Sequence, residues 1–173
     1  MLASFVRAMD RLQGLCTVVA GICLVVITLV IPLGVFTRYV LDHALSWPEP
    51  LAVLLMIWFS FTAAALCYRE RLHIAVGYLP SILSGWPRLA LGVVIELAMA
   101  AVSLFMLVYG VRLVEATYHQ TIAEFPLLSV GISYLPVPLG GLVTLLFVVE
   151  RLWTGRLFAE AGADPDAAPI AIE

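Results

Sequence analysis

The sequence LQGLCTVVAGICLVVITLVIPLGVFT, from Leu12 to Thr37, decides the fold class. It contains no charged residue, and Arg11 and Arg38 flank it. A helix of 26 residues is about 39 Å long, whereas the hydrocarbon core of a bilayer is about 30 Å thick. A core helix of a soluble protein would carry a polar stripe, and this stretch has none. We therefore predict a transmembrane helix, which is too long for the apolar region of a cleaved signal peptide.

The composition extends this prediction to the whole chain. Hydrophobic residues make up 63% of the 173 residues, charged residues make up 12%, and the mean hydropathy is +1.07. A soluble domain of this size could not bury so much apolar surface, so lipid must cover much of it. The net charge is only -3 and lysine is absent, which argues against binding of nucleic acid.

Four apolar segments predict an all-α integral membrane protein with four transmembrane helices, at residues 12–37, 51–68, 89–111 and 132–149. These helices would form one domain over residues 1–155. The linker between the first two, which mixes aromatic and charged residues, is expected to lie on the membrane surface. Between the last two helices we expect a mixed loop, residues 112–131. The polar tail, residues 156–173, is expected to be disordered.

The arginines predict the orientation. With four spans, both termini and the connection between the second and third spans lie on one side. That side holds seven arginines, namely Arg7, Arg11, Arg69, Arg71, Arg88, Arg151 and Arg156. The other side holds Arg38 and Arg112. The positive-inside rule then places both termini in the cytoplasm.

The three cysteines, Cys16, Cys23 and Cys67, lie within or at the end of apolar runs. The first two are about 10.5 Å apart along one helix, too far for a disulfide. We expect them to be small packing residues, and the sequence predicts neither a metal site nor a cofactor.

Glu96 is the one acidic residue inside a predicted span, on a face with Gly92 and Ala100. One interpretation is a carboxylate that couples ions or protons in a small stand-alone multidrug exporter. The other, which we favour, is an acid that pairs with a neighbouring helix or lies near the cytoplasmic interface.

A haem-binding membrane anchor of a respiratory enzyme is a further alternative, since the chain contains His43, His73 and His119. Axial ligands of such an anchor must lie inside the spans, and all three histidines fall in linkers. Their positions therefore argue against haem.

Several short motifs resemble the small membrane subunit, the DctQ-type small permease, of TRAP (tripartite ATP-independent periplasmic) transporters. They are Arg38-Tyr39, Ser46-Trp47-Pro48-Glu49, Arg69 with Arg71, His73-Ile74-Ala75-Val76, Phe125-Pro126, and the run from Tyr134 to Gly140. The likeness covers residues 5–155. One departure is Pro50, at a position where the family often has a second acid beside the first.

This resemblance implies a transporter component rather than an enzyme. In that family, a periplasmic binding protein captures an organic anion, commonly a carboxylate, and a large membrane subunit moves it inward with a sodium gradient. The small subunit would pack stably on the fixed scaffold of the large one, within the lipid of the bacterial inner membrane. It would also offer periplasmic surface for transient contact with the binding protein.

The candidate interface or anchoring residues are Arg38, Trp47, Glu49, Arg69, Arg71, His73 and Glu96. Arg38 and Glu49 could pair with each other or with the large subunit, while Trp47 would fix the depth of the helix in the membrane. The alternative is that these residues serve only as topological anchors. No catalytic or substrate-binding residue is predicted.

Overall fold

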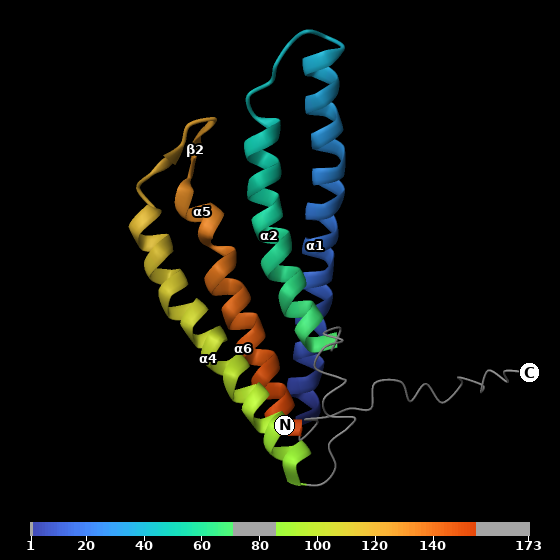
Figure 1. Cartoon of the computed structure of the whole chain (residues 1–173), viewed down its shortest axis with the longest axis vertical. Helices are drawn as coiled ribbons and strands as arrows, with labels where there is room; N and C mark the ends of the chain where they lie inside the picture. Colours follow the sequence, from blue (N-terminus) through green and yellow to red (C-terminus); the bar gives the residue numbers. More distant parts are fainter. Residues whose placement is uncertain (1, 71–85, 155–173) are drawn as a thin grey trace, which may run out of the picture.

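The structure is a computed structural model that describes residues 2–70 and 86–154 (Figure 1). Its helices are α1 (Leu2–Tyr39), α2 (Pro48–Glu70), α4 (Trp86–Thr117), α5 (Val130–Tyr134) and α6 (Pro136–Thr154). Two short antiparallel strands, β1 (Thr121–Ile122) and β2 (Phe125–Ser129), lie between α4 and α5. Four helical segments are long and apolar enough to cross a membrane, which confirms the predicted all-α membrane fold.

The helices extend beyond the segments that hydropathy marks. α1 has 38 residues and α4 has 32, which correspond to about 57 Å and 48 Å, so both exceed the thickness of the hydrocarbon core. α4 continues into the predicted loop at residues 112–131, and the two strands occupy residues 121–122 and 125–129 of it. The fourth segment is interrupted at Leu135, because Pro136 has no N–H group to continue the helical hydrogen bonds.

The helices form two antiparallel pairs, α1 with α2 and α4 with α6, and the pairs meet where α2 contacts α6 (Figure 1). The pairs converge at one end and separate toward the other (Figure 1). The rings of Phe5 and Trp153 lie 5.7 Å apart at the converging end, so α1 begins where α6 ends. We call this end the terminal end, and the opposite end, with residues 37–50 and 117–135, the linker end.

A seven-residue spacing explains how α1 packs. Its buried residues include Met9, Cys16, Cys23, Val30 and Thr37, each seven positions after the last. This spacing keeps one seam of a helix facing a neighbour, which here is α2. Both cysteines on the seam are buried thiols without a disulfide, so they act as small packing residues.

Glycines allow α4 and α6 to approach closely. A Cβ atom added to Gly141 would lie 2.8 Å from the carbonyl oxygen of Ser103. A Cβ added to Gly110 would lie 2.8 Å from Cδ of Pro138. Small residues of this kind let helix backbones come together in membranes.

The apolar core cluster lies at the terminal end and consists of Met9, Ala65, Tyr68, Phe147 and Val148. The outer faces of α1 and α4 remain apolar and exposed. Leu29 of α1 is 67% exposed and Phe105 of α4 is 60% exposed. In a membrane protein, such faces contact lipid or a partner subunit.

Candidate functional site

Charged and polar side chains from four helices meet at the terminal end. We call this set the ionic cluster; it consists of Asp10 and Gln13 of α1, Tyr68, Arg69 and Glu70 of α2, Glu96 of α4, and Glu150 and Arg151 of α6. The cluster borders the apolar core, because Tyr68 belongs to both.

Arg69 joins three helices. Its Nε and Nη2 atoms donate to the two carboxylate oxygens of Glu150, at 3.0 and 2.8 Å. Nη2 also donates to Asp10 Oδ1 at 2.7 Å, and Nη1 donates to the amide oxygen of Gln13. The same guanidinium lies over the ring of Phe147, 5.1 Å from its centroid. The two-point pairing with Glu150 fixes both distance and orientation between α2 and α6.

Arg151 makes the corresponding connection to α4. Its Nη1 atom donates to Glu96 Oε1 at 3.0 Å, and its Nη2 atom donates to the carbonyl oxygen of Tyr68 at 2.5 Å. The hydroxyl of Tyr68 donates to the other oxygen of Glu96. The Arg151 guanidinium also lies 4.2 Å from the centroid of the Tyr68 ring, a cation–π contact.

Helix geometry explains why two adjacent residues of α6 reach different partners. Neighbouring residues on an α-helix point about 100° apart. Glu150 therefore faces Arg69 on α2, while Arg151 turns toward Glu96 on α4. Through side chains of opposite charge, this stretch of α6 thus contacts α2 in the other helix pair and α4 in its own pair.

Four of the six charged groups of the cluster are largely withdrawn from solvent, while Asp10 and Glu70 are exposed. The exposed fraction of the side chain is 3% for Glu96, 12% for Glu150, 13% for Arg69 and 14% for Arg151. Removing one partner of a buried ion pair typically costs about 3–5 kcal/mol, because the remaining charge stays buried without compensation. Each of these four groups has a partner of opposite charge, which makes the cluster a determinant of how the helices are arranged.

The predicted candidate residues occupy two separate places. Arg69 and Glu96 belong to the ionic cluster, where Glu96 pairs with a neighbouring helix rather than standing alone. Arg38, Trp47 and Glu49 lie at the linker end. Arg71 and His73 lie outside the described residues.

At the linker end, Arg38 and Glu49 are both exposed. Neither takes part in the ion pairs found within residues 2–70 and 86–154, so the structure does not join them to each other. Trp47 is half-buried directly before α2. These three side chains are therefore available to a partner or to the membrane interface.

Sequence reasoning missed Asp10, Gln13, Glu150 and Arg151 as parts of a site, because each lies at or near the end of an apolar run and resembles an ordinary helix end. A signal was nevertheless present. Residues of opposite charge at these borders were all assigned to the same side of the membrane as Arg69. Charges at equal depth on neighbouring helices can pair.

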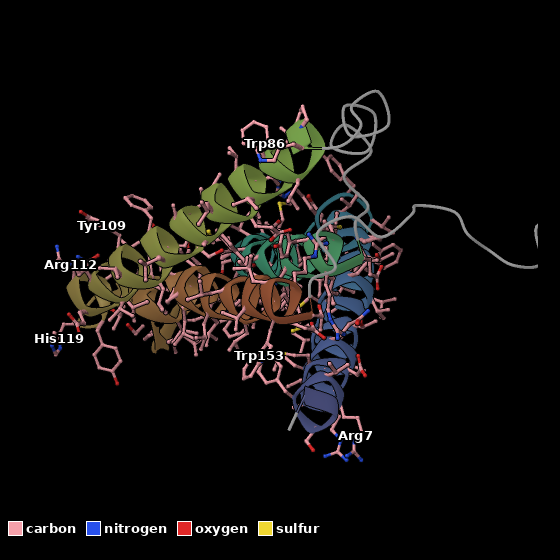
Figure 2. All side chains as sticks on the ribbon, turned by 90° about the horizontal axis from the view of Figure 1, so that it is seen from below. Arg7, Trp86, Tyr109, Arg112, His119 and Trp153 are labelled. Carbon is pink, nitrogen blue, oxygen red and sulfur yellow. The ribbon has the colours of Figure 1, made fainter. Side chains whose placement is uncertain are left out.

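Figure 2 draws the described side chains and labels Arg7, Trp86, Tyr109, Arg112, His119 and Trp153. Arg7 projects from the start of α1, away from the other helices (Figure 2). Near the C-terminal end of α4, at the linker end of the molecule, the guanidinium of Arg112 lies 5.4 Å from the ring centroid of Tyr109. His119 lies beyond the end of α4, and His43 lies in the linker, so neither of these two is inside a helix.

Comparison with known proteins identifies the family. No curated protein matches the chain. A family profile does match, over residues 27–157, and its description is the DctQ component of tripartite ATP-independent periplasmic transporters. The matched segment covers well over half of the chain and includes α2, α4, α5 and α6. The chain therefore belongs to the DctQ family and is a multi-pass membrane protein, the small subunit of a TRAP transporter.

Proposed function

We propose that this subunit packs on the scaffold of the large permease and supports import of an organic anion, driven by an ion gradient. A periplasmic binding protein would deliver the anion, commonly a carboxylate, to the assembled transporter. The match to the DctQ component is the observation that carries this proposal.

The distribution of apolar surface supports a packing role. The outer faces of α1 and α4 expose large side chains along much of their length, among them Leu15, Leu29, Leu97 and Phe105. A stable partner could cover part of this surface, while lipid covers the remainder. The ion pairs of Arg69 and Arg151 hold the four helices together, so the array would present a preformed surface to the permease.

The arginines support a bacterial inner-membrane orientation with the terminal end in the cytoplasm. Arg7, Arg11, Arg69 and Arg151 lie toward that end, whereas Arg38 and Arg112 lie toward the linker end. The excess of arginine follows the positive-inside rule. In this orientation the strands β1 and β2 face the periplasm, where the binding protein would dock.

Co-expression with the large permease subunit of the same transporter tests the proposed assembly. An affinity tag on the C-terminal tail of this chain should retain the permease at equal stoichiometry through detergent purification. As a matched control, an unrelated four-span membrane protein with the same tag should retain none. Failure of the tagged chain to retain the permease would contradict stable assembly.

Accessibility of engineered cysteines tests the orientation. On a background with Cys16, Cys23 and Cys67 replaced by alanine, Ala123→Cys between the strands should react with an impermeant maleimide added to intact spheroplasts. Ala8→Cys near the start of α1 should react only after lysis. The reverse pattern would overturn the proposed orientation.

A further inference from the structure

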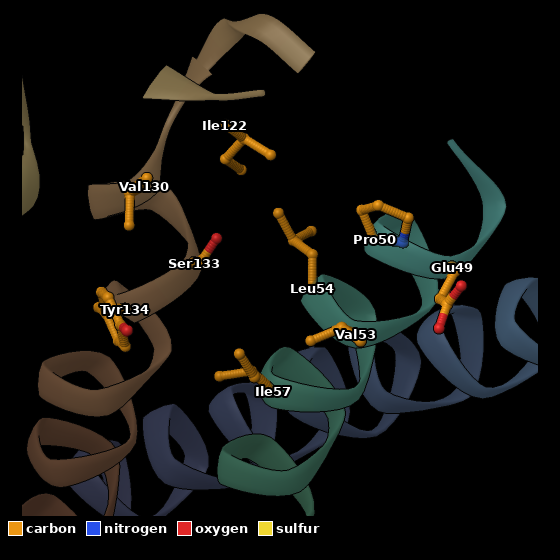
Figure 3. A pocket seen from close by; sticks show the side chains of 9 residues that line it. All are labelled: Glu49, Pro50, Val53, Leu54, Ile57, Ile122, Val130, Ser133 and Tyr134. Atoms are coloured by element: carbon orange, nitrogen blue, oxygen red, sulfur yellow. The ribbon is translucent and has the colours of Figure 1, made fainter. Parts of the chain in front are cut away.

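A groove lies at the linker end, between the first half of α2 and the segment that contains β1 and α5 (Figure 3). Its volume is about 380 Å³. Val53, Leu54 and Ile57 line it from α2, and Ile122 and Val130 line it from the opposite side. The residues that line the groove belong to the linker end, where the two helix pairs have separated (Figure 1), whereas the ionic cluster lies at the terminal end.

The walls of this groove are mostly aliphatic and belong to membrane-spanning segments. Val53 to Ile57 fall within the first three turns of α2, and Val130 opens the last candidate span. Aliphatic side chains gain free energy when an apolar group, rather than water, covers them. An apolar ligand is therefore expected, and in a bilayer the abundant apolar ligands are acyl chains.

Polar groups lie in the groove and at its edge, where the headgroup of a bound lipid would emerge from between the apolar walls. The hydroxyl of Ser133 points into the groove, and the side chain of Glu49 lies at its edge (Figure 3). The Glu49 carboxylate is exposed and forms no ion pair with the described residues. Its negative charge complements a primary ammonium group, such as that of an ethanolamine headgroup.

We propose that the groove holds one acyl chain of a phospholipid whose ammonium headgroup pairs with Glu49. The chain would fill the space between α2 and α5 in the leaflet at the linker end. This lipid site goes beyond the proposed transport role, and it would exist whether or not the permease is bound.

Photo-crosslinking in lipid nanodiscs tests the proposal directly. The full chain is reconstituted with a phosphatidylethanolamine probe that carries a diazirine in its acyl chain, and the adducts are mapped by mass spectrometry. We expect adducts concentrated on Leu54, Ile57 and Val130. Equal labelling of these residues and the outward-facing Leu29 would overturn the proposal, because it would indicate bulk lipid only.

A groove-filling variant sharpens the test. Leu54→Trp should lower labelling of Val130 roughly tenfold, which corresponds to a loss of about 1.4 kcal/mol in binding free energy. The matched variant Leu29→Trp, on the exposed face of α1, should leave that labelling unchanged. If Leu54→Trp does not fold, Ile57→Trp provides the same test from the next turn. Unchanged labelling of Val130 in a folded groove variant would contradict the lipid site.

Two further comparisons identify the headgroup and exclude a protein occupant. Glu49→Gln should reduce labelling by the ethanolamine probe but not by a phosphatidylglycerol probe with the same acyl chain. Equal effects on both probes would overturn the ammonium assignment. In the complex with the permease, Leu54 should still react with lipid; an adduct with the permease in its place would assign the groove to a protein side chain.

Discussion

The two ends of this molecule are held together in different ways. At the terminal end, Arg69 and Arg151 connect four helices through buried ion pairs that border the apolar core. At the linker end, the two helix pairs separate around a groove, and the charged residues Arg38 and Glu49 are exposed. The comparison indicates that the terminal end fixes the architecture, while the linker end leaves surfaces available to lipid and partners.

The largest effect is expected from breaking the central ion pair. Among the described residues, Glu150→Ala leaves the buried Arg69 guanidinium with only Asp10, which is 59% exposed, as a charged partner. Loss of one member of a buried pair should lower the free energy of unfolding by about 3–5 kcal/mol. Titration with SDS in mixed micelles, followed by circular dichroism, measures this change. The linker-end variant Glu49→Ala is the control and should change it by less than about 0.5 kcal/mol.

A smaller loss is expected where glycine allows helix contact. In Gly141→Val, the new Cβ would lie 2.8 Å from the carbonyl oxygen of Ser103, so α4 and α6 must move apart. Overpacking of this kind typically costs about 1–3 kcal/mol in the free energy of unfolding. The same titration measures it. Gly21→Val is the matched control, since a Cβ added at Gly21 meets nothing within 4 Å; equal losses would show that the α4–α6 approach is not responsible.

Within the ionic cluster, removal of an exposed charged side chain should reduce the free energy of unfolding less than removal of a buried one. Asp10 pairs with the same guanidinium as Glu150, but its side chain is 59% exposed, compared with 12% for Glu150. Solvent weakens such a pair, so Asp10→Ala should reduce the free energy of unfolding by about 0–1 kcal/mol. Thermal unfolding of both variants in one detergent compares them. A loss for Asp10→Ala as large as that for Glu150→Ala would refute the role of burial.

The smallest effect on stability is expected at Arg38. This residue is exposed and forms no ion pair with the described residues, so Arg38→Ala should change the free energy of unfolding by less than about 0.5 kcal/mol. A role at an interface would instead appear as reduced retention of the permease during co-purification. Normal retention and normal uptake would indicate that Arg38 acts only as a topological anchor.

Hydropathy was sufficient to predict the four membrane helices, because an uncharged run such as Leu12–Thr37 has few other stable conformations. The ends of the helices were harder to predict from the sequence. α4 continues to Thr117 through polar residues that read as a loop, and the break at Leu135 depends on which proline begins the next helix.

The ionic cluster could not be predicted, because its pairs join residues far apart in sequence. Arg69 and Glu150 are 81 positions apart, and nothing in the local pattern of either indicates the other. Glu96 was recognised as unusual by its position in an apolar run. Its partner Arg151 was read only as an arginine near a helix end.

Uptake by reconstituted liposomes tests most directly whether this chain is an accessory subunit of the transporter. Liposomes that contain the large permease and this chain, with the binding protein outside and an imposed sodium gradient, should accumulate the labelled organic anion. Liposomes that lack either membrane subunit should accumulate only background amounts. Uptake by this chain alone, or full uptake by the permease without it, would contradict its assignment as an accessory subunit.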